Sequence, residues 1–161
     1  VTDEKLVQER IKWAATHDSL TGVGNRAFFQ RRLEDALARA GGSKPVGLLM
    51  LDIDFFKQIN DTLGHAAGDA MLIHASEVLL SKLRAGDFVA RIGGDEFVVV
   101  CVDDSGDEVL VGLAERIIST MRLPVAYQGH ECRFGVSVAA AISILAQANV
   151  QPQTALQLLQ G

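Results

Sequence analysis

The sequence has few cysteines, no apolar run of membrane-spanning length and no excess of positive charge. Cys101 and Cys132 stand in apolar or strand-like contexts, and without a secretory signal we expect both to be reduced thiols in or near the core. No run reaches the ~18 apolar residues of a membrane span, and residues 1–5 are too polar for a signal peptide. We therefore expect a cytoplasmic domain without membrane contact of its own, although other segments of the full-length protein can attach it to a membrane.

The net charge of −5 argues against nonspecific binding of nucleic acid through a basic surface. A small anionic nucleotide is still a compatible ligand, because metal ions and local cations can offset its charge. The chain has 161 residues, of which 48% are hydrophobic and 22% charged, and it contains no internal repeat or low-complexity tract. These values are typical of one soluble globular domain with a substantial core.

Hydrophobic periodicity and turn residues predict alternating helices and strands. The expected helices are 3–16, 25–40, 69–83, one from about 106 that ends before Pro124, and about 153–160. The expected strands are 46–53, 88–92, 96–102, 125–128 and 131–144. This order predicts an α+β fold in which helices cover one sheet.

The most informative stretch is RIGGDEF at residues 91–97, where two glycines precede two acidic residues and an apolar strand. A glycine turn between strands lets the backbone approach a ligand closely. Adjacent carboxylates on such a turn can hold a hard cation such as Mg²⁺. An ordinary hairpin is the alternative, because Gly-Asp also favours such turns.

A second acidic stretch follows the apolar run at residues 46–51 and begins with Asp52-Ile53-Asp54. Carboxylates at the end of a buried strand are unfavourable unless they are paired, solvated or bound to metal. If this strand lies beside the one after Gly94, Asp52 and Asp95 or Glu96 could share one or two metal ions. Paired metals about 4 Å apart suit nucleotidyl transfer, because they stabilise both the attacking and the leaving oxygens.

Three ordered motifs resemble the GGDEF family, the diguanylate cyclases. They are DSLTGVGNR at 18–26, DIDFFKQINDTLGH at 52–65 completed by Gly68-Asp69, and GGDEF at 93–97. The resemblance implies the ferredoxin-like palm fold of nucleotidyl cyclases, with a mainly antiparallel central sheet covered by helices. It also implies an N-terminal linker or signalling helix at 1–16 and a GGDEF domain at 17–161.

The resemblance assigns the metal ligands, with Mg²⁺ or Mn²⁺ as the cofactor. Asp52 and Asp95 would bind the metal through their side chains and Ile53 through its carbonyl. Glu96 would be either a second metal ligand or the base for the ribose 3′-hydroxyl, and this choice is open. Solvated acids at strand ends are the alternative for Asp52 and Asp95.

The same resemblance assigns the GTP site. Asn60 and Asp69 look like the guanine readers, because a carboxylate accepts from guanine N1–H and N2–H and adenine has no such pair of donors. Lys57 and the backbone of Phe55 and Phe56 look like a phosphate cradle, with Lys57 counted among the catalytic groups. The alternatives are a helix cap for Asn60, a surface acid or cap for Asp69, and an additional core role for both phenylalanines.

The remaining GTP contacts are expected from Gly93 and Gly94 in the signature turn and from His65. Beside Gly64, His65 is favoured as a structural turn residue over a catalytic one. Ala139 departs from the family, which usually has glycine in the strand at this place. The family's C-terminal lysine and arginine, which contact the triphosphate, are missing, so we expect a C-terminally truncated domain.

Residues 84–87, Arg-Ala-Gly-Asp, occupy the place of the family's inhibitory site for the product. Arg84 would grip phosphate or stack on guanine, and Asp87 would accept from the guanine edge. Arg116 resembles a secondary arginine of that site. A surface helix end with a local ion pair is the alternative.

Three functions therefore compete. The first is a diguanylate cyclase that joins two GTP into cyclic di-GMP as a homodimer, with an upstream sensor and possible downstream signalling domains in the full-length protein. The second is a catalytically silent module that binds GTP or cyclic di-GMP and regulates a neighbouring domain. The third is a structural dimerisation domain, which would not explain why the metal and guanine positions are all filled by competent residues.

Overall fold

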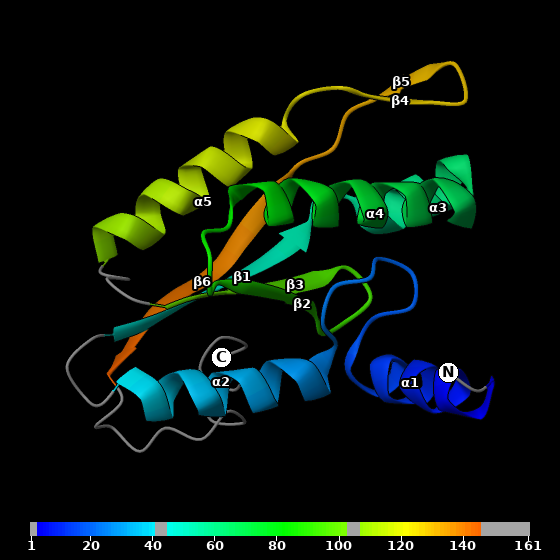
Figure 1. Ribbon diagram of the computed structural model, residues 1–161. Coiled ribbons are helices and arrows are strands. Elements are labelled where there is room, and N and C mark those ends of the chain that lie inside the picture. The colour runs from blue at the N-terminus through cyan, green and yellow to red at the C-terminus, as the bar shows by residue number, and fades with distance from the viewer. Residues whose placement is uncertain (1–2, 41–44, 103–106, 146–161) are drawn as a thin grey trace.

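The computed structural model describes residues 3–40, 45–102 and 107–145. Its helices are α1 Asp3–Thr16, α2 Arg26–Ala40, α3 Phe56–Leu63, α4 His65–Lys82 and α5 Asp107–Met121. Its strands are β1 Pro45–Ile53, β2 Phe88–Arg91, β3 Glu96–Cys101, β4 Val125–Tyr127, β5 His130–Cys132 and β6 Val136–Leu145. Figure 1 shows the main sheet between two layers of helices, with α3, α4 and α5 on one side and α2 on the other.

The main sheet has the strand order β2-β3-β1-β6, and every neighbouring pair is antiparallel. The α+β class and the mainly antiparallel sheet are confirmed. Strand β1 lies in the middle and is buried on both faces: Leu49 and Leu51 pack toward α4 and α5, whereas Leu48 and Met50 pack toward α2. Burial on both faces explains why this strand reads as a continuous apolar run rather than an alternating one.

Helix α1 is the exception to the layered packing. It contains no buried residue, and Figure 1 shows it lying beside the end of α2, away from the sheet. Helix α2, by contrast, buries Phe29 and Leu33 against the sheet. The predicted bounds of both helices agree with the structure to within one residue.

Three parts of the element prediction are wrong. The helix expected at 69–83 begins earlier, at His65 of α4. Helix α3 was not expected, although Phe56, Ile59 and Leu63 follow helical spacing. The single strand expected at 131–144 is two strands, β5 and β6, which belong to different sheets. The chain leaves β5 and crosses to the main sheet around Gly135, whose carbonyl accepts the Asp54 N–H at 2.8 Å. The expected helix at 153–160 lies outside the described residues.

Strand β6 has an irregularity at Ala139. Met50 of β1 pairs with Ala140 and Leu51 with Val138, so one residue of β6 is unpaired between them. This is a β-bulge, which bends a strand and increases its local twist. The family's glycine position is thus occupied here by a bulged alanine, next to the strand that carries Asp52.

The cysteines behave as expected. Cys101 is buried and Cys132 is partly buried, and neither forms a disulfide. Burial is the main reason that the pKa of the Cys101 thiol rises to about 12. Within the described ranges, no helix combines the length and the apolar composition that crossing a bilayer requires.

Candidate functional site

The end of β1 and the signature turn meet at one edge of the sheet. Asp52 pairs with Glu96 in the antiparallel register, and the Ile53 N–H donates to the Asp95 carbonyl at 3.1 Å. The structure therefore brings together the acidic residues that the sequence predicted as metal ligands. Their positions follow from the pairing of two buried apolar strands, which leaves the polar ends of both at the same edge.

The pKa of Asp52 is shifted by its surroundings at this edge. Burial raises the pKa of its carboxyl, and the negative charges of Glu96, Asp95 and Asp54 raise it further. Its Oδ1 is buried and has no hydrogen-bond partner among the described residues. A buried carboxylate oxygen without a partner, surrounded by like charges, is energetically unfavourable unless a cation offsets it.

The donors at this edge fit a hard divalent cation, because Asp52, Asp95 and Glu96 supply carboxylate oxygens. In the part of the chain that the structure describes, however, no three His, Cys, Asp or Glu side chains already form a metal-holding group. A complete ligand set at this edge would thus need further oxygens, such as the Ile53 carbonyl.

Asp54 faces the opposite neighbour of β1. Its side chain accepts a hydrogen bond from the Ser137 hydroxyl, and its N–H donates to Gly135. A Cβ at position 135 would come within 3.1 Å of the Asp54 Oδ2. Glycine at 135 therefore lets the chain pass close to Asp54, which fixes the turn that follows β1.

The signature turn is held by Arg91. Its guanidinium donates to the Gly94 carbonyl through Nη2 at 2.8 Å and through Nε at 3.1 Å. The same side chain forms an ion pair with Asp18 at 3.1 Å, and Asp18 also accepts from the N–H and hydroxyl of Thr21. Although burial acts to raise the pKa of Asp18, these hydrogen bonds and the Arg91 charge lower it overall.

The two signature glycines differ in their surroundings. A Cβ at Gly93 would stand 3.0 Å from the Glu96 Oε2, so a side chain there would displace this carboxylate. A Cβ at Gly94 would meet nothing within 4 Å, and Gly94 is exposed. The absence of a side chain at 94 leaves open space beside Asp95, which is compatible with close approach of a ligand.

The start of α3 lies directly after the acidic edge. Phe55 is its N-cap, with a left-handed backbone (φ 58°) and no side-chain hydrogen bond to the helix. Phe56 packs against the core, but Phe55 is 72% exposed, so a core role for Phe55 is wrong. Lys57 in the first turn is exposed. Uncapped amides and a nearby lysine are features that suit an anionic phosphate.

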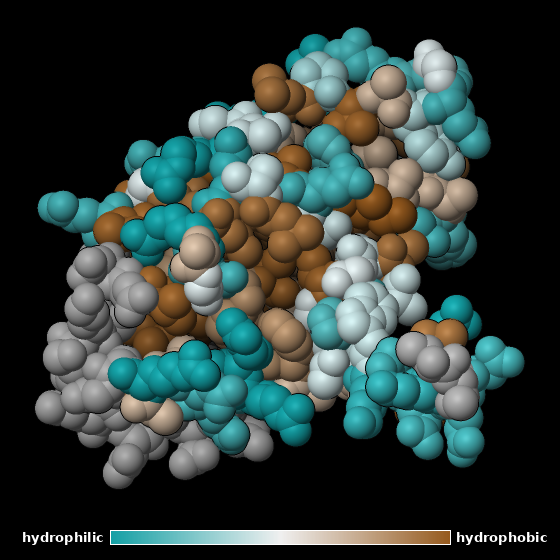
Figure 2. Space-filling view, viewed as in Figure 1, coloured by the Kyte–Doolittle hydropathy of each residue, from teal (hydrophilic) through white to brown (hydrophobic). Residues whose placement is uncertain are grey.

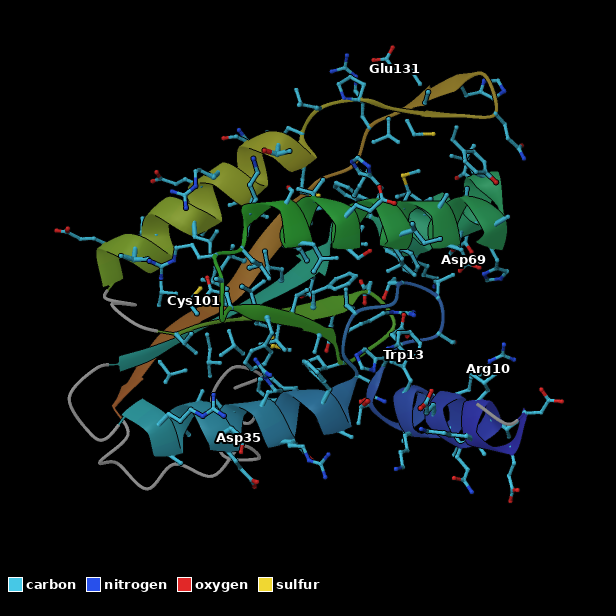
Figure 3. The ribbon with its side chains drawn as sticks, in the orientation of Figure 1. Arg10, Trp13, Asp35, Asp69, Cys101 and Glu131 are labelled. Carbon is cyan, nitrogen blue, oxygen red and sulfur yellow. The ribbon has the colours of Figure 1, made fainter. Side chains whose placement is uncertain are left out.

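Asn60 and Asp69 come from two successive helices. Asn60 lies inside α3 and Asp69 one turn into α4, so neither is a helix cap. A Cβ at Gly68 would collide with the Asn60 side-chain amide, which shows that Asn60 packs directly on the residue before Asp69. Figure 3 shows Asp69 on the side of α4 that faces the loop after α1, and Figure 2 shows the surface indented there.

His65 is exposed at the first residue of α4, directly after Gly64. Gly64 has φ 96°, a conformation that glycine adopts without strain. The chain reverses here between α3 and α4. His65 therefore stands at the reversal that Gly64 makes between the two helices.

The predicted inhibitory residues lie elsewhere. The Asp87 side chain is 3% exposed, and its Oδ2 lies 3.6 Å from Nε of Arg84. It also accepts the Arg84 N–H at 3.1 Å and the Val102 N–H at 3.0 Å. Asp87 thus ties the connection before β2 to the end of β3, and the local ion pair of the alternative reading is present. The Arg84 side chain is 54% exposed.

Arg116 belongs to the same region. The charges of Asp87, Arg84 and Arg116 all act on the buried Cys101 thiol, which ends β3. Arg116 is exposed on α5 and lines a surface depression of about 450 Å³ with Lys82 and Ser119. Figure 3 shows Cys101 and Asp69 at opposite ends of the molecule, so the inhibitory residues are remote from the predicted guanine readers.

The roles of Asp18 and Arg91 were missed at the sequence level. Both residues stand in motifs that the sequence displays, but they are 73 positions apart. Their ion pair depends on how the loop after α1 folds against β2. Here the backbone of Gly24 bridges to β2, accepting the Arg91 N–H at 2.8 Å.

Comparison with known proteins agrees with the motifs. The family described as diguanylate cyclase, GGDEF domain, matches residues 15–158. Diguanylate cyclase TpbB of Pseudomonas aeruginosa is 44% identical over 112 residues, which are 69% of this chain and 26% of TpbB. Cyclic di-GMP phosphodiesterase PdeR of Escherichia coli is 38% identical over 143 residues, which are 89% of this chain and 21% of PdeR.

A solved structure shares the architecture. The coiled coil and GGDEF domain of DgcB from Caulobacter crescentus, in complex with c-di-GMP, matches with a TM-score of 0.84 and 26% identity. The match covers 98% of this chain and 84% of that one. The chain spans about a quarter or less of the two curated relatives. Because the family matches residues 15–158 and the sheet edge carries its signature, the chain belongs to the GGDEF family of diguanylate cyclase domains.

Proposed function

We propose that this chain is one half-site of a diguanylate cyclase, which condenses two GTP into cyclic di-GMP with release of pyrophosphate. The observation that carries the proposal is Asp52. Its unpartnered buried oxygen and its raised pKa, caused by burial and three neighbouring carboxylates, describe a position that favours a divalent cation. A purely structural domain would gain nothing from this arrangement.

When bound, Mg²⁺ or Mn²⁺ would neutralise phosphate charge and polarise the α-phosphate for attack. Asp52, Asp95 and the Ile53 carbonyl would hold it. Glu96, across from Asp52 in the register, would either complete the ligand set or take the proton from the ribose 3′-hydroxyl. The uncapped first turn of α3 and Lys57 would orient the phosphates, and in-line positioning would then supply much of the rate.

Base choice would come from Asn60 and Asp69. The Asp69 carboxylate would accept from guanine N1–H and N2–H, and the Asn60 amide can both donate and accept. Gly68 places the Asn60 side chain against α4, so both readers are supported by one helix. His65, Gly93 and Gly94 would line the same site through positions near the helix start and the open signature turn.

The experiment is incubation of the full-length protein with GTP and Mg²⁺, with chromatographic detection of cyclic di-GMP and pyrophosphate. Asp95→Asn should abolish product, because it removes charge from the metal site. Asp35→Asn is the matched control: Asp35 is exposed on α2, on the opposite face of the sheet from α3 and α4 (Figure 3). Near-normal synthesis by Asp95→Asn, or none by the unmodified protein, would contradict the proposal.

A silent regulatory module is the second candidate. The bulge at Ala139 pairs with β1 just before Asp52, where a local change of twist could displace the metal ligands. One relative, PdeR, is named a cyclic di-GMP phosphodiesterase. In that case GTP would bind without turnover, and its binding would change the activity of a neighbouring domain in the full-length protein.

A further inference from the structure

Phe55 combines two features that are unfavourable in an isolated domain. Its φ is 58°, in the left-handed region that bulky residues rarely adopt. Its side chain is also 72% exposed, more than any other large hydrophobic residue in the described part of the chain. Strained backbone conformations persist where the surrounding structure enforces them, and they concentrate at functional sites.

The surrounding contacts enforce this conformation. Asp54, the preceding residue, is held by the Gly135 carbonyl and by the Ser137 hydroxyl. On the other side, the Phe55 carbonyl accepts the Ile59 N–H at 3.0 Å and begins α3. The ring is therefore held outward by a rigid turn, while its neighbour Phe56 packs against the core.

The position of the ring indicates what covers it. Phe55 follows β1 by two residues, so it stands beside the edge where Asp52 and Glu96 meet. Two phosphodiester bonds between two GTP molecules require two such edges to face each other. Because Phe55 is exposed beside this edge, its ring is available for contact with a second domain that faces the edge.

We propose that Phe55 is an anchor of the catalytic dimer, covered by a second copy of this chain. The inference rests on the proposed function and adds a residue that sets assembly of that site. An aromatic side chain that is exposed in the monomer and desolvated in the complex has the properties of an interface hot spot. Contact with the second copy would remove the ring from water when the two half-sites assemble.

The test is sedimentation of the full-length protein with Mg²⁺ and a GTP analogue that cannot react, at analogue concentrations that saturate both the variant and the unmodified protein. Phe55→Asn should weaken dimerisation tenfold or more, because asparagine tolerates the left-handed turn but supplies no apolar ring. Its thermal midpoint should not fall, since backbone strain is relieved. Phe55→Tyr should dimerise like the unmodified protein. Leu123→Ala is the control, because Leu123 is 62% exposed and lies after α5.

Product formation separates this inference from the proposed function. For Phe55→Asn, the rate deficit should be large at low protein concentration and shrink when a fused coiled coil enforces dimerisation. Equal dimerisation of Phe55→Asn and the unmodified protein would overturn the inference and leave the cyclase proposal standing. Failure of the unmodified protein to dimerise with the analogue would also overturn it. Dimerisation through Phe55 without product would overturn only the cyclase proposal.

Discussion

At Asp52 the fold holds a carboxylate in a place that disfavours its charge. Because the pKa of the folded state is raised above the ordinary value of 3.8, its stabilising contribution is present below that value and is lost as pH rises. At neutral pH and without metal, the ionised Asp52 therefore destabilises the fold. A raised carboxyl pKa of this kind is expected at a position that binds a cation.

Asp52→Asn should raise the unfolding temperature of the metal-free protein at pH 7. The difference from the unmodified protein should shrink as pH falls, because the raised pKa makes Asp52 take up its proton in the folded protein before the ordinary value of 3.8 is reached. Added Mg²⁺ should stabilise the unmodified protein more than the variant. Thermal unfolding in chelator and in Mg²⁺, over a pH series, measures all three effects. A variant that is less stable than the unmodified protein in chelator at pH 7 would contradict this account.

Gly68 leaves space for the side chain of Asn60, a predicted guanine reader. A Cβ at 68 would occupy the place of the Asn60 amide, so Gly68→Ala should displace that side chain. Overpacking of this kind costs about 1–3 kcal/mol. The variant should also lose much of its preference for GTP over ATP, because Asn60 is one of the two predicted guanine readers.

Gly112→Ala is the matched control for Gly68→Ala. Gly112 is also helical, but the nearest atom to its added Cβ is the flexible Arg116 Nη1 at 3.4 Å. Replacing a helical glycine by alanine stabilises by about 0.5–1 kcal/mol where space allows. Urea unfolding and nucleotide calorimetry compare the two variants. Unchanged discrimination between GTP and ATP in Gly68→Ala would remove Asn60 from base recognition.

At the scale of elements, a short series of side-chain contacts connects α1 to the rest of the domain. The Trp13 ring stacks on His17, with centroids 4.3 Å apart, and His17 in turn contacts Phe28 of α2. The next residue, Asp18, is paired with Arg91, which holds the signature turn. One continuous set of contacts thus links the end of α1 to the turn that carries Asp95.

Arg91→Ala should destabilise the protein by roughly 1.5–3 kcal/mol, the range for lost hydrogen bonds to charged groups. The pKa of Asp18, which Arg91 helps to lower, should rise. A depressed pKa contributes stability above the ordinary value of 3.8 that is lost as pH falls, so the variant and the unmodified protein should converge in acid. Urea unfolding at several pH values and NMR titration of Asp18 test this. An unchanged Asp18 pKa would show that the ion pair does not persist in solution.

On the scale of the whole molecule, two sets of charged groups occupy opposite ends of β3. Glu96 begins the strand at the predicted metal edge, and Cys101, near Arg84 and Asp87, ends it. Five residue steps along a strand separate them by about 17 Å. A ligand at the Arg84 end would therefore not overlap the metal site and would have to act through rigid strands or through assembly.

Arg84→Ala should weaken binding of cyclic di-GMP without Mg²⁺ by about tenfold, which corresponds to about 1.4 kcal/mol, and should leave GTP affinity unchanged. Arg84 is the better target, because Asp87 is committed to the backbone of Arg84 and Val102. Arg122→Ala on exposed surface after α5 is the control. Calorimetry with cyclic di-GMP measures the affinity of the unmodified protein and of both variants. Identical binding by Arg84→Ala and the unmodified chain would leave this segment as a structural turn.

Much of the candidate site follows from local sequence. The apolar run of β1 and the glycine turn before β3 placed both acidic segments at strand ends, and antiparallel pairing then joined Asp52 to Glu96. The helices α2, α4 and α5 followed from apolar spacing. Helix α3 was missed because its eight residues are too few for apolar spacing to distinguish a helix from other structure.

The sequence by itself determined the family, the class of fold and the two acidic segments at strand ends, because these depend on motifs and periodicities a few residues long. The tertiary structure decided the Arg91–Asp18 pair, the burial of Asp87, the exposure of Phe55 and the split between β5 and β6. Each of these features depends on which segment, distant in the sequence, packs against the residue concerned. Phe55 and Phe56 show the reason: they are adjacent and identical, yet the turn after β1 directs one ring into the core and the other outward.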